Sequence, residues 1–226
     1  MDFLKLIRSF EDLLFELLCW LIYYPRTLWL VVRHPLRMID YSNHEQTDAD
    51  EDQYTDTLSP PLLLLITLAL LHALELGLNT QHIQAHNAVG AMVVSSDQNL
   101  ILWCSFVYGL LPLFAALHVV RRKGQPLERK YLRPPFFGQC YLVSAYALMV
   151  AIATMTAQHI GAWKWALGLS GAGFATLWYL WVQSMLFRTM LNMRPLRAWG
   201  GAILVFVAAF LTAILVSLLT IGRKRL

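Results

Sequence analysis

The sequence has few charged residues, and its acidic residues stop early in the chain. Only 14% of the 226 residues are charged while 58% are hydrophobic, and no Asp or Glu follows Glu128. Water-soluble domains carry about 25% charged and about 45–50% apolar residues. This composition excludes an ordinary soluble domain. The basic residues lie at the ends of apolar runs, which argues against nucleic acid as a partner.

Cysteines and catalytic motifs are equally scarce. The three cysteines, Cys19, Cys104 and Cys140, are widely separated among apolar residues, which excludes a disulfide framework or a zinc-ligand cluster. The chain contains no Gly-x-Ser-x-Gly, no phosphate-binding loop and no Cys–His pair at useful spacing. We therefore expect no enzymatic activity and no cofactor.

Two histidines have a spacing that metal sites use. His82 and His86 are four residues apart, and on a helix two imidazoles at this spacing can bind one metal ion. Only Glu75 or Asp97 offers a third ligand, so we expect no metal site.

Long apolar runs dominate the remaining sequence. Five runs of about 20 residues cover 60–78, 100–120, 135–157, 165–187 and 198–221. A helix of that length spans the ~30 Å hydrocarbon core of a bilayer. The pattern predicts an all-α, polytopic transmembrane bundle of five spans over residues 59–222, followed by a basic tail at 223–226.

The N-terminal region has a different pattern. A narrow polar stripe on an otherwise apolar helix is formed by Asp2, Lys5, Arg8 or Ser9, Asp12 and Glu16, and it is typical of a helix lying in the membrane interface. We expect residues 1–40 to form such amphipathic helices on the membrane surface.

Three arginines follow this stripe. Arg26, Arg33 and Arg37 are spaced by seven and four residues and are predicted to share one helix face, with Trp29 nearby. A basic, tryptophan-containing helix suits anionic lipid headgroups. The alternative is ordinary packing beneath the bundle. Residues 41–58 contain six acidic residues and no Lys or Arg, and predict a flexible, solvated loop.

Basic residues are unevenly divided among the connecting segments. Residues 121–134 contain six, among them Arg121, Arg122 and Lys123, whereas 79–99 contain none. Positive charge favours the cytoplasmic side, so we expect a cytoplasmic N-terminus, as in a protein of the bacterial inner membrane. With five spans, the basic tail 223–226 then lies on the outer side, although positive charge favours the cytoplasmic side. The alternative is a sixth crossing through residues 10–32.

One acidic residue falls inside the five runs. Glu75 lies three residues after His72, so the two side chains share a helix face. Ionisable groups in a span are functional candidates, and this pair could relay a proton. The alternative is an interfacial polar pair, because Glu75 is only about 5 Å from the outer end of its span.

Small residues are concentrated in the fourth run. Gly168 and Ala172, and likewise Gly171 and Ala175, are four residues apart. Such pairs let helix backbones approach closely. We expect these four residues to pack helices together, with the fourth span central in the bundle.

The layout resembles the Yip1 family of small five-span membrane proteins. Asp56-Thr-Leu-Ser-Pro60 is similar to the Asp-Leu-x-Gly-Pro stretch before the family's first span, with Ser in place of Gly and Leu displaced. Tyr108-Gly-Leu-Leu-Pro112 is similar to its Tyr-Gly-x-x-x-Pro stretch but one residue shorter. The resemblance implies a membrane scaffold or adaptor.

Two functions fit these patterns. The first is a non-enzymatic scaffold or assembly factor whose partners are the bilayer and another membrane protein or a second copy of the chain. The alternative is a small permease or transporter subunit with a polar site around His72 and Glu75, to which Gln139, Ser144 and Gln183 would contribute. The permease requires these polar groups to converge on one cavity.

Overall fold

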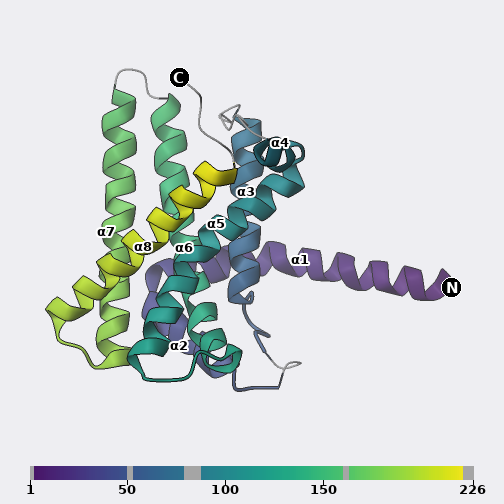
Figure 1. Cartoon of the computed structure of the whole chain (residues 1–226). Coiled ribbons are helices and arrows are strands. Elements are labelled where there is room, and N and C mark those ends of the chain that lie inside the picture. The colour runs from purple at the N-terminus through teal and green to yellow at the C-terminus, as the bar shows by residue number, and fades with distance from the viewer. Residues whose placement is uncertain (1–2, 50–52, 79–87, 160–162, 221–226) are drawn as a thin grey trace.

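The structure is a computed structural model that describes residues 3–49, 53–78, 88–159 and 163–220. These residues are almost entirely helical and include no strand, which confirms the all-α class (Figure 1). In chain order the helices are α1 (Phe3–Arg33), α2 (Pro35–Glu45), α3 (Pro60–Gly77), α4 (Ala88–Val94), α5 (Asp97–Arg122), α6 (Arg129–His159), α7 (Lys164–Leu191) and α8 (Pro195–Thr220).

Five helical segments of the described chain are long and apolar enough to cross a membrane. They are Ser9–Arg33, Pro60–Gly77, Asp97–Arg122, Arg129–Gln158 and Pro195–Thr220. Four of them contain predicted spans. The predicted span 165–187 lies in α7, which is not among the five, because its glycines, tryptophans and tyrosine lower its mean hydropathy. The N-terminal segment, for which we expected no crossing, meets the same criteria of length and composition.

Helix α6 occupies the centre of the bundle. It packs against α2, α3, α5 and α7, while α8 packs on α5 and α7. Six consecutive residues of α6, from Cys140 to Ala145, are at most 1% exposed, so this stretch is surrounded on all sides. The expectation that the fourth run is central was therefore wrong: α7 lies at the side of α6 and leaves Leu169 and Phe174 exposed.

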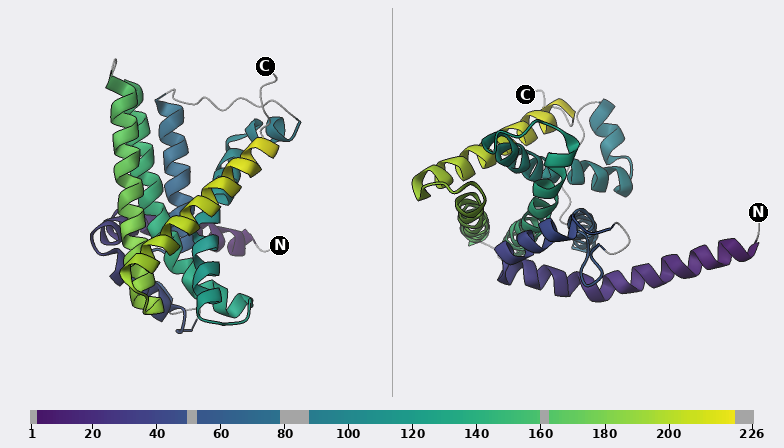
Figure 2. Two further views of the ribbon diagram at one scale, coloured as in Figure 1. Left: turned by 60° about the vertical axis from the view of Figure 1, so that its left-hand side comes forward. Right: turned by 90° about the horizontal axis from the view of Figure 1, so that it is seen from below.

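Helix α1 has a direction unlike that of the bundle. Helices α3, α6 and α7 run side by side, whereas α1 lies crosswise to them and its N-terminal part extends away from them (Figures 1 and 2). Its outer part carries exposed apolar side chains, among them Phe10, Phe15, Leu18 and Leu21. Glu16 accepts a hydrogen bond from Trp20 Nε1 at 3.0 Å, so one residue of the predicted polar stripe is bound within its own helix.

The segment between α2 and α3 is attached to the bundle. The predicted loop 41–58 begins with the last five residues of α2, and its far end packs inward, with Thr57 and Leu58 buried. Tyr141 Oη of α6 donates a hydrogen bond of 2.6 Å to the carbonyl of Leu58. Thr27 Oγ1 of α1 accepts one from the Leu58 amide at 3.2 Å. These bonds join α1, α3 and α6 at one end of the bundle.

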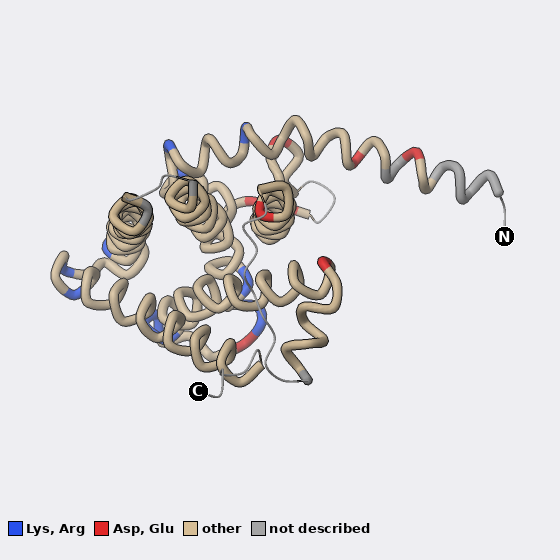
Figure 3. The backbone as a smooth tube through the Cα atoms, turned by 90° about the horizontal axis from the view of Figure 1, so that it is seen from above, with Lys and Arg blue, Asp and Glu red and all other residues tan. Residues whose placement is uncertain are grey.

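Charged residues are sparse along the helices and gather at that end. The α5–α6 and α7–α8 connections and α2 all lie at the lower end in Figure 1. Viewed from the opposite end, the helices are mostly free of Lys, Arg, Asp and Glu (Figure 3). The basic segments 121–134 and 188–197 therefore share one end of the molecule.

Candidate functional site

His72 binds a carboxylate from another helix that the sequence did not suggest. Its Nε2 lies 3.1 Å from Oδ1 of Asp97, in the first turn of α5. The His72 side chain is 7% exposed and that of Asp97 68%. The pair therefore joins α3 to α5 where one partner is buried and the other reaches solvent. Ser96, the N-cap of α5, accepts the Asn99 amide and fixes the turn that carries Asp97.

Glu75 is half-buried on the same face of α3. Its charge acts on Cys104 and Tyr108 of α5, so it faces that helix. The structure thus brings His72, Asp97 and Glu75 to one end of the α3–α5 contact. His82 and His86 lie outside the described residues, and no group of three His, Cys, Asp or Glu side chains in the described part could hold a metal ion.

A separate polar pair lies between α6 and α7. Ala157 packs near Gly168 and Ala153 near Gly171, so the two helices are antiparallel. Tyr146 Oη lies 3.4 Å from Thr176 Oγ1. Seven residues earlier in α6 and seven residues later in α7, this register puts Gln139 and Gln183 at a similar level of the two helices. Both glutamines are at most 1% exposed.

These glutamine side chains keep unpaired polar atoms. Oε1 of Gln139 and both Nε2 and Oε1 of Gln183 have no hydrogen-bond partner among the described residues. Ser144 donates to the Cys140 carbonyl of its own helix at 2.8 Å. Buried amides without partners are costly in a low-dielectric interior, and in the described part His118 Nε2 and Tyr179 Oη are unpaired in the same way.

The polar residues considered for a permease do not converge. Tyr141 binds Leu58 just before α3, so Gln139 lies near the level at which the parallel helix α3 begins. His72 is twelve residues further along α3 than Pro60, or about 18 Å. The histidine and the glutamines therefore belong to different helix pairs at different heights of the bundle.

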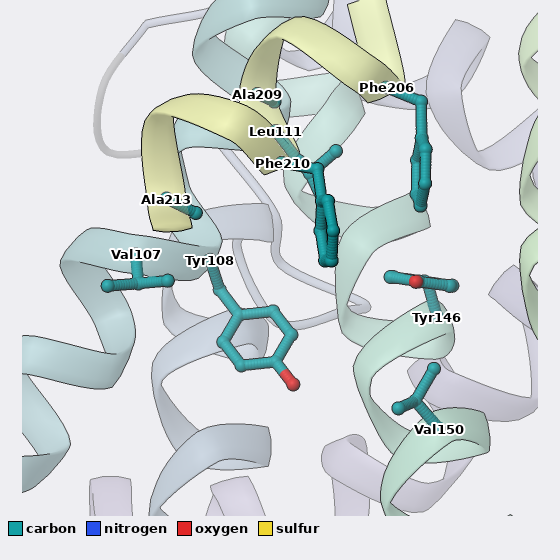
Figure 4. Close-up of a pocket in the computed structure, with 9 residues that line it drawn as sticks. All are labelled: Val107, Tyr108, Leu111, Tyr146, Val150, Phe206, Ala209, Phe210 and Ala213. Carbon is teal, nitrogen blue, oxygen red and sulfur yellow. The ribbon is translucent and has the colours of Figure 1, made fainter. Parts of the chain in front are cut away.

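The cavity in Figure 4 is apolar. It has a volume of about 250 Å³ and lies between α5, α6 and α8. Its lining combines aliphatic side chains with the rings of Tyr108, Tyr146, Phe206 and Phe210. None of His72, Glu75, Gln139, Ser144 and Gln183 lines it. Sites that orient a reacting molecule need a few convergent polar groups, and this lining suits hydrocarbon instead.

Helix packing around α7 depends on small residues. A Cβ atom on Gly171 would lie 2.6 Å from Cβ of Ala153, and one on Gly168 would lie 3.0 Å from Cβ of Ala157. Ala175 is fully buried and Ala172 half-buried. The structure thus places three of the four small residues, Gly168, Gly171 and Ala175, along the face of α7 that packs into the bundle.

The three N-terminal arginines do not share one helix. Arg26 and Arg33 belong to α1, but the helix ends at Arg33 and Arg37 lies in α2. The cause is Pro35, which disfavours helical backbone at the preceding residue; His34 has φ −134° and ψ 58°. Arg33 stacks on Trp29, with Cζ 5.9 Å from the ring centroid, and Arg37 lines a cavity between α2 and α7.

The other predicted basic residues are exposed at the end of α5. Arg121 and Arg122 form its last turn and Lys123 is its C-cap, where positive charge complements the helix dipole.

Sequence reasoning missed Tyr41, Tyr54 and Tyr141, which hold the segment before α3. Burial raises the pKa of Tyr41 to about 12. Tyr41 and Tyr54 lie within the acidic segment, whereas the sequence around Tyr141 gives no signal of this role.

Comparisons of the chain with protein-family models, curated proteins and solved structures found no match.

Proposed function

We propose that this protein is a non-enzymatic scaffold or adaptor of a membrane. The observation that carries the proposal is the direction of α1. It is a long helix with exposed apolar side chains that lies crosswise to α3, α6 and α7 (Figure 2). If those three helices cross a bilayer, α1 cannot cross with them, and it lies along the membrane surface instead.

The orientation follows from charge. The end of the bundle that holds Arg121, Arg122 and Lys123 faces the cytoplasm, because cytoplasmic segments are enriched in basic residues. Helix α7 runs beside α6 and crosses with it, which gives five spans in α3 and α5 to α8. In this arrangement Arg26, Arg33 and Arg37 lie near anionic headgroups of a bacterial inner membrane. A Yip1-like identity is compatible with this layout and remains a proposal.

The scaffold role also agrees with the distribution of polar groups. His72 and Asp97 join two helices at one end, Gln139 and Gln183 are buried on another helix pair, and the Figure 4 cavity contains none of them. A permease would need a shared polar path near the midplane. The exposed side chains of α1 offer another membrane protein, or a second copy, a surface within the membrane interface.

Cross-linking in the host membrane, followed by purification in mild detergent, tests the scaffold role. Leu18→Asp with Leu21→Asp places charge on exposed apolar positions of α1 and should abolish the partner cross-links of the wild type. Ser9→Asp adds a charge to the polar stripe and should keep them. Unchanged cross-links in the double variant, with its bundle still folded, would contradict the proposal.

The permease alternative has its own test. Glu75→Gln removes the half-buried carboxylate that faces α5 while keeping its size. The scaffold account predicts unchanged partner cross-links and unchanged growth of the host. Lost function in a variant that folds normally and retains its partner would favour transport through the site around His72 and Glu75.

A further inference from the structure

Another cavity lies at the basic end of α6. Its volume is about 560 Å³, and it is lined by Arg129, Leu132, Arg133, Phe136 and Phe137 of α6 together with Leu113 of α5. It therefore combines two guanidinium groups with an apolar wall made by two neighbouring helices. This composition differs from that of the Figure 4 cavity, whose lining carries no charged residue.

Arg129 and Arg133 are four residues apart on one helix, and both are exposed. Among the described residues, no carboxylate forms an ion pair with either arginine. Arg133 instead stacks on Phe137, with Cζ 5.2 Å from the ring centroid. The pair therefore presents two positive charges whose donors remain available to an anion from outside.

The apolar lining continues from these charges into the bundle. Phe137 is one turn of α6 beyond Arg133, about 6 Å along the helix axis. Leu113 of α5, which is 38% exposed, lines the same cavity. A molecule that fits must place an anionic group at the arginines and a hydrocarbon chain along Leu113 and Phe137. Basic pockets between transmembrane helices bind lipid headgroups in this way.

We propose that this cavity binds an anionic glycerophospholipid, with its phosphate on Arg129 and Arg133 and an acyl chain against Leu113 and Phe137. Guanidinium groups bind phosphate oxygens through paired hydrogen bonds, and the phosphate supplies a counter-charge. The inference rests on the proposed crossing of the membrane by α5 and α6, but not on a scaffold role. The proposal is a defined site for one lipid molecule, which is distinct from the general attraction of anionic lipids to the basic surface.

Native mass spectrometry of the full chain in neutral detergent tests this site. Phosphatidylglycerol should form a saturable one-to-one complex, and phosphatidylcholine should bind at least about tenfold more weakly. The double variant Arg129→Gln, Arg133→Gln should raise the apparent Kd for phosphatidylglycerol by about tenfold to thirtyfold. The matched control, Arg121→Gln with Arg122→Gln, removes the same charge from the same connection outside the cavity and should change the Kd less than about threefold.

Three results would overturn the assignment. Equal weakening by the two double variants would mean general surface attraction. Equal binding of the two lipids would mean that the arginines do not select an anion. Displacement of the lipid by millimolar inorganic phosphate would mean a free-phosphate site. Leu113→Glu leaves both arginines in place and should also weaken the binding of phosphatidylglycerol. This variant tests the site even if the arginine variant fails to fold. None of these results depends on partner cross-links, so they leave the scaffold proposal unaffected.

Discussion

Tyr141 Oη donates a hydrogen bond of 2.6 Å to the carbonyl of Leu58, 83 residues away in the chain. Tyr141 is fully buried and Leu58 is 4% exposed. Thr57 Oγ1 lies 3.3 Å from the same hydroxyl. The bond joins the entry of α3 to the central helix, so the buried phenol of Tyr141 contributes to the position of α3.

Removing that phenol should destabilise the bundle. Tyr141→Phe keeps the ring but leaves the Leu58 carbonyl without its donor, which should cost about 1–3 kcal/mol of the free energy of unfolding. Denaturant unfolding in detergent, followed by circular dichroism, measures the change. Tyr131→Phe is the control: Tyr131 is half-buried, its hydroxyl has no hydrogen bond to a described residue, and its loss should change stability by less than about 0.5 kcal/mol. Equal stability of both variants would refute the role of the bond.

The α6–α7 contact predicts opposite effects for two glycines of one helix. Gly171→Ala places a methyl group 2.6 Å from Cβ of Ala153, so the helices must separate; overpacking of this kind costs about 1–3 kcal/mol. Gly173→Ala meets nothing within 4 Å and should be neutral or stabilising by up to about 1 kcal/mol, because alanine favours helix over glycine. Thermal unfolding of both variants in one detergent provides the comparison. A Gly171→Ala variant as stable as Gly173→Ala would contradict the observed contact.

The bond between His72 and Asp97 should make a modest contribution to stability. Asp97→Ala removes the Nε2 partner of a buried histidine and should cost about 0.5–1.5 kcal/mol of the free energy of unfolding. Asp97→Asn retains an acceptor oxygen and should recover at least half of that loss. Both values come from the same denaturant titration. An asparagine variant as unstable as the alanine variant would show that the carboxylate charge, and not the hydrogen bond, is needed.

Tyr41 predicts a loss of stability at alkaline pH. Its pKa is raised from 10 in the unfolded chain to about 12, chiefly because burial disfavours the phenolate. The folded state therefore retains the proton where the unfolded state loses it. The contribution is complete below pH 10 and is lost as the pH rises through 12. The wild type should lose more stability between pH 10 and 12 than Tyr41→Phe, as measured by denaturation midpoints. Parallel curves would refute the shift.

The apolar runs predicted most of the fold. Runs of about 20 residues define α3, α5, α6 and α8 because length and hydropathy alone decide whether a helix can span a bilayer. Their ends were less predictable. Helix α6 begins at Arg129, six residues before the predicted run 135–157, so Pro134 and Pro135 lie inside the helix. Proline fits the first turn of a helix because the N–H that it lacks would have no partner there. The sequence does not show, however, how many helical residues precede such a proline.

The contacts between helices were not predictable from the sequence. The spacing of Gly168, Gly171 and Ala175 indicated a packing face, but not that α6 would be the helix against it. His72 and Glu75 were paired by proximity along the chain, whereas the carboxylate that His72 binds, Asp97, comes from another helix 25 residues later. Such pairings depend on the register between helices, which one sequence does not record. The break between Arg33 and Arg37 was foreseeable from Pro35 alone.

The central claim is that α1 lies along the membrane surface beside a bundle that crosses the membrane. Single spin labels at positions 9 to 24, in vesicles and with Cys19 and Cys104 replaced by serine, measure depth through their collision rates with oxygen and with a water-soluble nickel chelate. The account predicts a constant mean depth along α1 with an oscillation of about 3.6 residues. A depth that increases steadily to the bilayer midplane and then decreases would show that α1 crosses the membrane and would contradict the account.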